Sequence, residues 1–105
     1  MKEFTKEEVL KDRGLSVEEF AAVAKESGLS ANLPDRMDRG DVMKLESDLF
    51  TAHRALAYSR GWPPRTDVAN ESQQWDCRDK TSGGYKEFAT FGDAWRYLSS
   101  QPAVL

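Results

Sequence analysis

The chain of 105 residues has one cysteine and no long apolar run, and each shortage excludes a class of protein. Because Cys77 has no second cysteine to pair with, an internal disulfide is excluded and an oxidising compartment finds no support. No apolar run approaches the roughly 20 residues of a membrane-spanning helix, and the charged N-terminus lacks the apolar segment of a signal peptide. We therefore expect a cytoplasmic protein without a membrane partner.

Side chains for catalysis and metal binding are equally scarce. His53 is the one histidine, and its helical spacing from Leu49 and Leu56 places it on the inward side of a helix. Cys77 lies near Trp75 in a predicted strand, where a small core residue fits better than a reactive thiolate. One His and one Cys cannot build a tetrahedral zinc site. We predict that the protein is not an enzyme and holds neither metal nor cofactor; an enzyme that uses His53 or Cys77 is the competing hypothesis.

A basic excess is also missing. The net charge is −3, from 15 basic and 18 acidic residues. Residues 1–50 hold 8 basic and 12 acidic residues, and residues 51–105 hold 7 and 6. Because phosphate neutralisation supplies much of the affinity for nucleic acid, this balance argues against direct nucleic-acid binding. The charge balance does not exclude a local strip of basic residues in the second half of the chain.

Helix-capping patterns are abundant in the first half of the sequence. The segments 5–8 and 16–19 are capping boxes, and Gly14 and Gly28 stand where the two short helices should end. Residues 30–40 contain turn-forming residues and predict a loop. Apolar residues at helical spacing then predict a long helix over residues 41–60, with Val42, Leu45, Leu49 and Leu56 on its inner face and Met43, Phe50 and Ala57 flanking them.

The second half has the alternation of short strands. Residues 73–80 and 85–89 alternate apolar and polar residues around a turn at 81–84, which predicts a β-hairpin. A third capping pattern at Thr90 and a stop at Pro102 predict a short final helix. Because an isolated hairpin is marginal in water, it should pack on the helices or gain a third strand, either from residues 66–69 or from another chain. A homodimer is therefore left open.

These elements define an α+β fold in a single domain spanning residues 1–105. Two short helices and one long helix in residues 1–62 pack on a C-terminal β-hairpin or small antiparallel sheet, and a short helix completes the 73–101 segment.

Three parts of the sequence are candidate partner-binding surfaces. Trp, Tyr and Arg are enriched among the residues that dominate protein interfaces. The proline-stiffened corner around residues 63–64 and the hairpin both carry such residues, and the first helices carry acidic ones that suit a basic partner. The candidates are Arg60, Trp62 and Arg65 at the corner, Arg78, Lys80, Tyr85 and Lys86 on the hairpin, and Glu18 and Glu19 on the acidic face. Trp62 has the loop setting that should leave it most accessible.

An alternative interpretation is a small DNA-binding regulator with a degenerate helix-turn-helix. Residues 15–30 resemble the first helix and turn of that motif, with Ala24 and Gly28 at the usual small-residue positions. Pro34 then falls inside the expected recognition helix, where it would remove a backbone donor and cost about 3 kcal/mol.

The end of the chain predicts a hairpin followed by one helix, over segments 75–78 and 85–98. With its small size and acidic balance, the chain resembles the accessory proteins of bacteriophages and mobile elements, including anti-CRISPR proteins. That resemblance implies a non-catalytic protein-binding module that inhibits a bacterial nucleic-acid-handling complex by occluding one of its surfaces.

Overall fold

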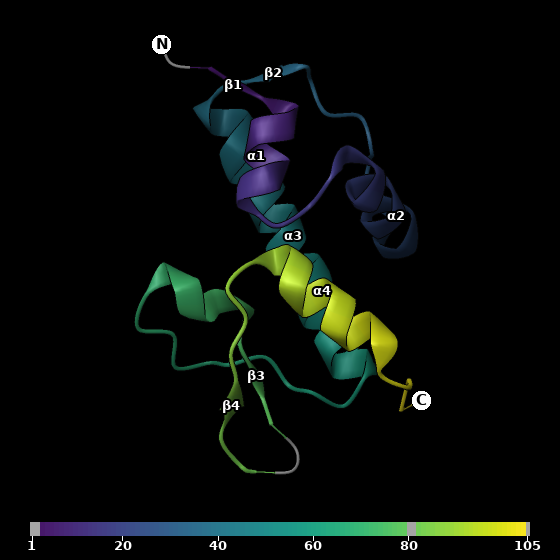
Figure 1. The fold of residues 1–105 in the computed structure, drawn as a ribbon, viewed down its shortest axis with the longest axis vertical. Helices are drawn as coiled ribbons and strands as arrows, with labels where there is room; N and C mark the ends of the chain where they lie inside the picture. The colour runs from purple at the N-terminus through teal and green to yellow at the C-terminus, as the bar shows by residue number, and fades with distance from the viewer. Residues whose placement is uncertain (1–2, 80–81, 105) are drawn as a thin grey trace. The chain divides into compact units, whose positions relative to one another are not determined.

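The structure, a computed structural model that describes residues 3–79 and 82–104, has an α+β fold (Figure 1). Its elements are β1 (Phe4–Thr5), α1 (Lys6–Asp12), α2 (Val17–Ser27), β2 (Arg36–Met37), α3 (Arg39–Ser59), a 3₁₀ helix (Glu71–Trp75), β3 (Cys77–Arg78), β4 (Tyr85–Lys86) and α4 (Phe91–Ser100). The predicted class, with three N-terminal helices, a hairpin and a final helix, is confirmed. The chain divides into two units, residues 1–49 and 50–105, and α3 runs from the first into the second. None of the helices in the described ranges has the length and apolarity that a membrane crossing requires.

The two short helices begin where the capping patterns predict. The Thr5 hydroxyl accepts a hydrogen bond from the Glu8 amide at 3.2 Å. At the start of α2, the Ser16 hydroxyl accepts from the Glu19 amide and the Glu19 carboxylate accepts from the Ser16 amide, both at 3.0 Å. Gly28 ends α2 with φ of 71°, a conformation that glycine adopts without a Cβ clash.

In the first unit, part of the segment predicted as a loop forms a strand, β2, which pairs antiparallel with β1. Phe4 pairs with Met37 and Thr5 with Arg36, so residues 30–40 are not loop throughout. Met37, the partner of Phe4, is fully buried. A strand of two residues is too short to show alternation, which is why the sequence pattern missed it.

α3 begins two residues earlier than predicted. The Asp38 carboxylate accepts from the Asp41 amide at 2.9 Å, and the Asp41 carboxylate accepts from the Asp38 amide at 3.1 Å, so Asp38 caps the helix. Leu45 and Leu49 are buried as predicted. The predicted flanking stripe is too wide, because Met43 is 65% exposed and Phe50 is 36% exposed.

The hairpin of the second unit is shorter than predicted and has a third segment beside it. Residues 71–75 form the 3₁₀ helix, so the first predicted strand begins only at Cys77. Cys77 pairs with Lys86 and Arg78 with Tyr85. On the other edge of β3, Cys77 bridges Pro64, so the segment beside β3 is not residues 66–69, which were one of the alternatives left open. Proline is tolerated at this edge position because no ladder hydrogen bond requires a backbone N–H there.

Aromatic side chains form the core of the second unit. The Trp75 ring meets the Phe91 ring edge to face with centroids 5.4 Å apart, and both residues are buried. Leu98 on α4 is also fully buried. Thr90 caps α4 as predicted, since its hydroxyl accepts from the Asp93 amide at 3.2 Å. This core gives the short hairpin a support that its own ladder could not supply.

Candidate functional site

His53 and Cys77, the residues that the sequence offered for nucleophilic catalysis, are both buried in the second unit. His53 is 1% exposed, and its Nε2–H donates to the Trp75 carbonyl at 2.9 Å. The Cys77 Sγ lies 3.6 Å from the same nitrogen. Burial lowers the pKa of His53 and raises the pKa of the Cys77 thiol to about 12. At neutral pH the histidine is a neutral donor and the thiol stays protonated, so this pair is arranged for packing.

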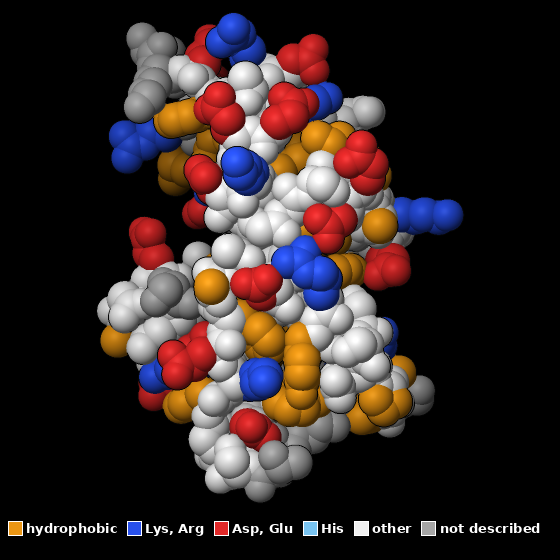
Figure 2. Space-filling model, viewed as in Figure 1, with side chains coloured by type: hydrophobic (Ala, Val, Ile, Leu, Met, Phe, Trp, Pro, Cys, Tyr) orange, Lys and Arg blue, Asp and Glu red, His pale blue; other side chains and the backbone are white. Residues whose placement is uncertain are grey.

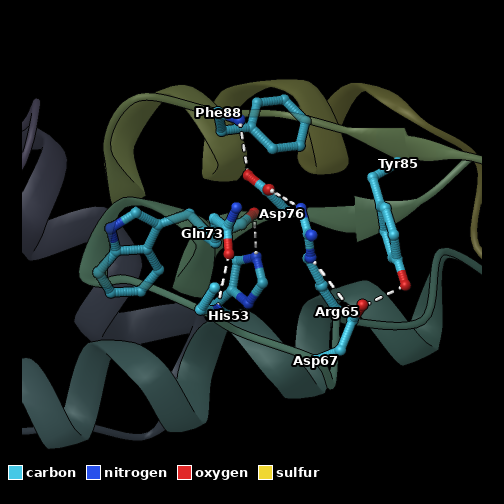
Figure 3. A network of polar contacts seen from close by, with 9 residues as sticks. His53, Arg65, Asp67, Gln73, Asp76, Tyr85 and Phe88 are labelled. Carbon is cyan, nitrogen blue, oxygen red and sulfur yellow. Dashed lines mark hydrogen bonds and ion pairs between the residues drawn. The ribbon is translucent and has the colours of Figure 1, made fainter.

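A buried carboxylate, Asp76, organises the polar network next to this core (Figure 3). Its Oδ2 accepts from Arg65 Nη1 at 3.1 Å, and its Oδ1 accepts from the Phe88 amide at 3.2 Å. The Arg65 amide also donates to the Asp76 carbonyl at 2.9 Å. One aspartate therefore joins the 63–65 segment, β3 and the chain after β4.

Tyr85 covers the outer side of this network (Figure 3). Its ring centroid lies 4.1 Å from the Arg65 guanidinium and 5.9 Å from the Arg78 guanidinium. The Tyr85 hydroxyl donates to Asp67 Oδ1 at 2.8 Å, and Arg65 Nε donates to the same oxygen at 3.2 Å. The hydrogen bond from Tyr85, with help from Arg65, lowers the pKa of Asp67, and the same bond raises the pKa of Tyr85. A tyrosine that remains 37% exposed is thereby held in one orientation.

Arg78 and Lys86 lie on opposite faces of the hairpin. Side chains of successive strand residues point to opposite faces, so Arg78 and Tyr85, which pair across the strands, share one face. Lys86 lies on the other face, and its Nζ is 4.8 Å from the ring centroid of Tyr97 on α4. Figure 2 shows a basic side chain among hydrophobic ones over β4 and α4. Within residues 3–79 and 82–104, neither Arg78 nor Lys86 forms an ion pair with a carboxylate.

The structure therefore brings together only part of the predicted hairpin surface. Arg65, Arg78 and Tyr85 form one cluster, and Lys86 is next to it across the ribbon. Lys80 lies outside the described residues. The Arg65 side chain is 16% exposed and pairs with the carboxylates of Asp67 and Asp76, so it holds the surface residues in place and is itself little accessible to a partner.

The corner residues are less accessible than predicted. Trp62 is 6% exposed and packs edge to face against Tyr97, with ring centroids 5.3 Å apart. Arg60 Nε donates to the Leu98 carbonyl at 3.1 Å. The bridge between Pro64 and Cys77 holds the corner against the hairpin. The expectation that its loop setting leaves Trp62 accessible is therefore wrong.

The predicted acidic face lies in the first unit and is mixed in charge. Glu18 is exposed, whereas the Glu19 carboxylate is occupied at the start of α2. An open groove of about 800 Å³ runs beside Glu18. Its lining includes two lysines as well as two glutamates, namely Lys6, Glu7, Lys11, Gly14, Leu15, Ser16, Val17 and Glu18. No uniform negative field follows from this arrangement.

Residues 28–35 bear on the helix-turn-helix alternative. After α2 the chain is irregular until β2, and every residue of this stretch is described. Pro34 lies in it, as the sequence argument anticipated. The motif's recognition helix is therefore missing.

Three important residues were not among the sequence candidates. Asp67 and Tyr97 each contact a candidate, Asp67 through Tyr85 and Tyr97 through Lys86. Asp76 lies between two buried residues, and simple alternation would have pointed it to solvent. The 3₁₀ helix that ends at Trp75 breaks the alternation and turns Asp76 inward. In the described part of the chain, no group of three His, Cys, Asp or Glu side chains could hold a metal ion.

Comparison of the chain with protein-family models, with curated proteins and with solved structures gives no match, so its function has to be inferred from these residues.

Proposed function

We propose that the protein is a non-catalytic protein-binding module and that Arg78, Tyr85 and Lys86, here called the hairpin surface, contact the partner. One observation carries the proposal: an exposed tyrosine, held by Asp67, has Arg78 beside its ring, Lys86 lies on the opposite face of the same hairpin, and neither cation has a carboxylate partner among the described residues. Tyrosine and arginine are the residue types that dominate binding energy at protein interfaces.

The chemistry of the hairpin surface favours an acidic partner. A cation held against an aromatic ring keeps its charge and remains able to meet a carboxylate from another molecule. Arg78 and Lys86 offer such charges on the two faces of one ribbon. Opposite charges across an interface speed association and select the partner. We therefore expect the contacted region of the partner to carry Asp or Glu side chains.

The non-catalytic part of the proposal is supported by the burial of His53 and Cys77. Nucleophilic catalysis requires a thiolate or hydroxyl that substrate can reach, with a base beside it. Cys77 is fully buried and its thiol has a raised pKa, and the Nε2–H of His53 donates to the Trp75 backbone carbonyl.

The resemblance to phage and mobile-element accessory proteins extends the proposal to the partner's identity. On this extension the partner is a bacterial nucleic-acid-handling complex in the cytoplasm, and the protein inhibits it by occluding a surface, as anti-CRISPR proteins do. Binding by charge and shape is compatible with such inhibition because it needs no chemistry in the inhibitor.

The test is affinity capture from a bacterial lysate, followed by mass spectrometry of the retained proteins. We compare the wild type with Arg78→Ala and Tyr85→Ala, and use Lys25→Ala as the control because Lys25 is an exposed cation on α2 of the other unit. We expect at least a tenfold drop in the retained partner for both hairpin variants and no change for the control. Equal retention by all four proteins would refute the hairpin surface as the binding site.

A second assay separates protein binding from nucleic-acid binding. In a gel shift at low salt, we expect the wild type to leave duplex and single-stranded DNA unshifted. A salt-dependent shift that Arg78→Ala abolishes would replace the proposal with the nucleic-acid alternative.

A further inference from the structure

The backbone of β4 has one edge bonded to β3 and one edge facing outward. The Arg78 amide donates to the Pro63 carbonyl at 2.8 Å, and the Arg65 amide donates to the Asp76 carbonyl at 2.9 Å. These bonds occupy the edge of β3 that faces away from β4. In an antiparallel ladder the direction alternates along the strand, so the amide and carbonyl of Cys77 face β4 and meet those of its register partner Lys86.

The same alternation applies along β4. Because the amide and carbonyl of Lys86 point to β3, those of Tyr85 and Glu87 point to the outer edge. Both residues are exposed. In the described residues, the sheet order is β3–β4 with no further strand beside β4. An edge with unpaired backbone groups is a template for another strand.

We propose that the partner adds an extended segment to the outer edge of β4 and that this segment carries an Asp or Glu opposite Lys86. This inference rests on the proposed function and specifies its binding mode. Backbone hydrogen bonds to Tyr85 and Glu87 supply affinity, as in other cases of strand addition. Side chains on directly opposed strand positions lie about 5 Å apart, within reach of an ion pair with Lys86.

Charge selects a foreign strand over a second copy of this chain. If two β4 strands pair antiparallel through their outer edges, the register that matches Tyr85 with Glu87 sets Lys86 opposite Lys86. The register that centres on Glu87 sets two glutamates opposite each other. Like charges at directly opposed positions destabilise a pair of strands.

The one remaining register of a self-pairing centres on Tyr85. It sets Glu87 opposite Gly83, whose φ of 76° takes that residue out of the extended conformation. Only one pair of residues could then exchange backbone hydrogen bonds. An acidic segment of another protein meets none of these obstacles and brings a carboxylate to the cation on Lys86, which has none among the described residues.

The decisive variant removes a single outward hydrogen-bond donor. Glu87→Pro deletes the Glu87 amide hydrogen, which the register places outside the β3–β4 ladder, and proline is tolerated at such edge positions. Lys86, the residue before it, is already in a strand, as a residue preceding proline prefers. Glu87→Ala is the matched variant, because it removes the same carboxylate and keeps the amide hydrogen.

The probe is a phage-displayed library of random twelve-residue peptides selected on the wild-type protein. We expect selected peptides to be rich in β-branched residues with Asp or Glu among them, and their dissociation constants to be at least tenfold higher for Glu87→Pro than for Glu87→Ala. We expect Lys86→Glu to weaken binding about tenfold and an acidic-to-Lys exchange in the peptide to restore it. Peptides that bind both Glu87 variants equally, or no enriched peptide at all, would overturn strand addition.

Amide hydrogen exchange gives a readout that needs no variant to fold. On addition of the selected peptide, exchange of the Tyr85 and Glu87 amides should slow at least tenfold, while the Lys86 amide, already bonded to β3, should change little. Protection confined to other segments would contradict the inference.

The two proposals fail in different ways. If the protein captured from lysate depends on Arg78 and Tyr85 but binds both Glu87 variants equally, the hairpin surface stands and strand addition is wrong. If capture is indifferent to Arg78 and Tyr85, the proposed function itself loses its site.

Discussion

Replacement of Asp76 by alanine tests whether this buried carboxylate holds the hairpin in place. The Asp76 side chain is 2% exposed, and its removal leaves the Phe88 amide without its acceptor and Arg65 without one of its two carboxylates. A buried amide left unpaired costs 1–3 kcal/mol, and breaking a buried ion pair costs 3–5 kcal/mol when the remaining charge stays dry. Arg65 keeps Asp67 and some contact with water, so we expect a total loss of about 3 kcal/mol in the free energy of unfolding.

The measurement is equilibrium urea unfolding at pH 7, followed by tryptophan fluorescence. All three tryptophans lie in residues 50–105, so the signal reports on the unit that contains Asp76. Asp76→Asn keeps an oxygen that can accept from the Phe88 amide and should cost about half as much. Asp93→Ala, which removes an exposed pair with Arg96, should cost less than about 0.5 kcal/mol. A cost below about 1 kcal/mol for Asp76→Ala would refute the role assigned to this network.

Three further measurements probe the interior and the helix starts. Cys77 should resist iodoacetamide at pH 7 in the folded protein and react at least a hundredfold faster in urea, because burial raises its pKa and blocks access; rapid labelling of the folded protein would contradict its sealed position. Because burial lowers the pKa of His53 below the ordinary histidine value of about 6.5, the unfolded chain binds the proton more readily and stability should fall as the pH drops below that value. Between pH 7.5 and 5.5, the free energy of unfolding should fall by up to about 1.4 kcal/mol less in His53→Gln than in the wild type. An equal fall in both proteins would show that protonation of His53 does not contribute to the pH dependence. Ser16→Ala should cost about 1 kcal/mol in thermal or urea unfolding, with the exposed Ser99→Ala on α4 as the comparison; no difference between them would show that the capping box contributes nothing.

Local sequence patterns predicted the starts of the helices because capping is a local interaction. A hydroxyl three residues before an amide needs no information from the rest of the chain, and the predictions at Thr5, Ser16 and Thr90 are all confirmed. Helical spacing placed Leu45, Leu49 and His53 inside for the same reason. The local sequence could not predict how wide the buried stripe on α3 is, because that width depends on which other segments cover the helix.

Periodicity missed β1 and β2, because alternation over two residues carries no signal. It found the hairpin, but predicted longer strands than the two-residue β3 and β4. Pro64 could not be chosen over residues 66–69 as the segment beside β3 without knowing how the corner folds back.

For the candidate site, the sequence by itself determined the residue types: a hairpin with Arg78, Tyr85 and Lys86, and a single histidine and a single cysteine. Only the tertiary structure decided which of these side chains reach solvent. Trp62 is buried against Tyr97 of α4, and Arg65 is paired with the buried Asp76. Burial and ion pairing depend on segments distant in the chain, so they are settled by packing, whereas capping and composition are settled by neighbours.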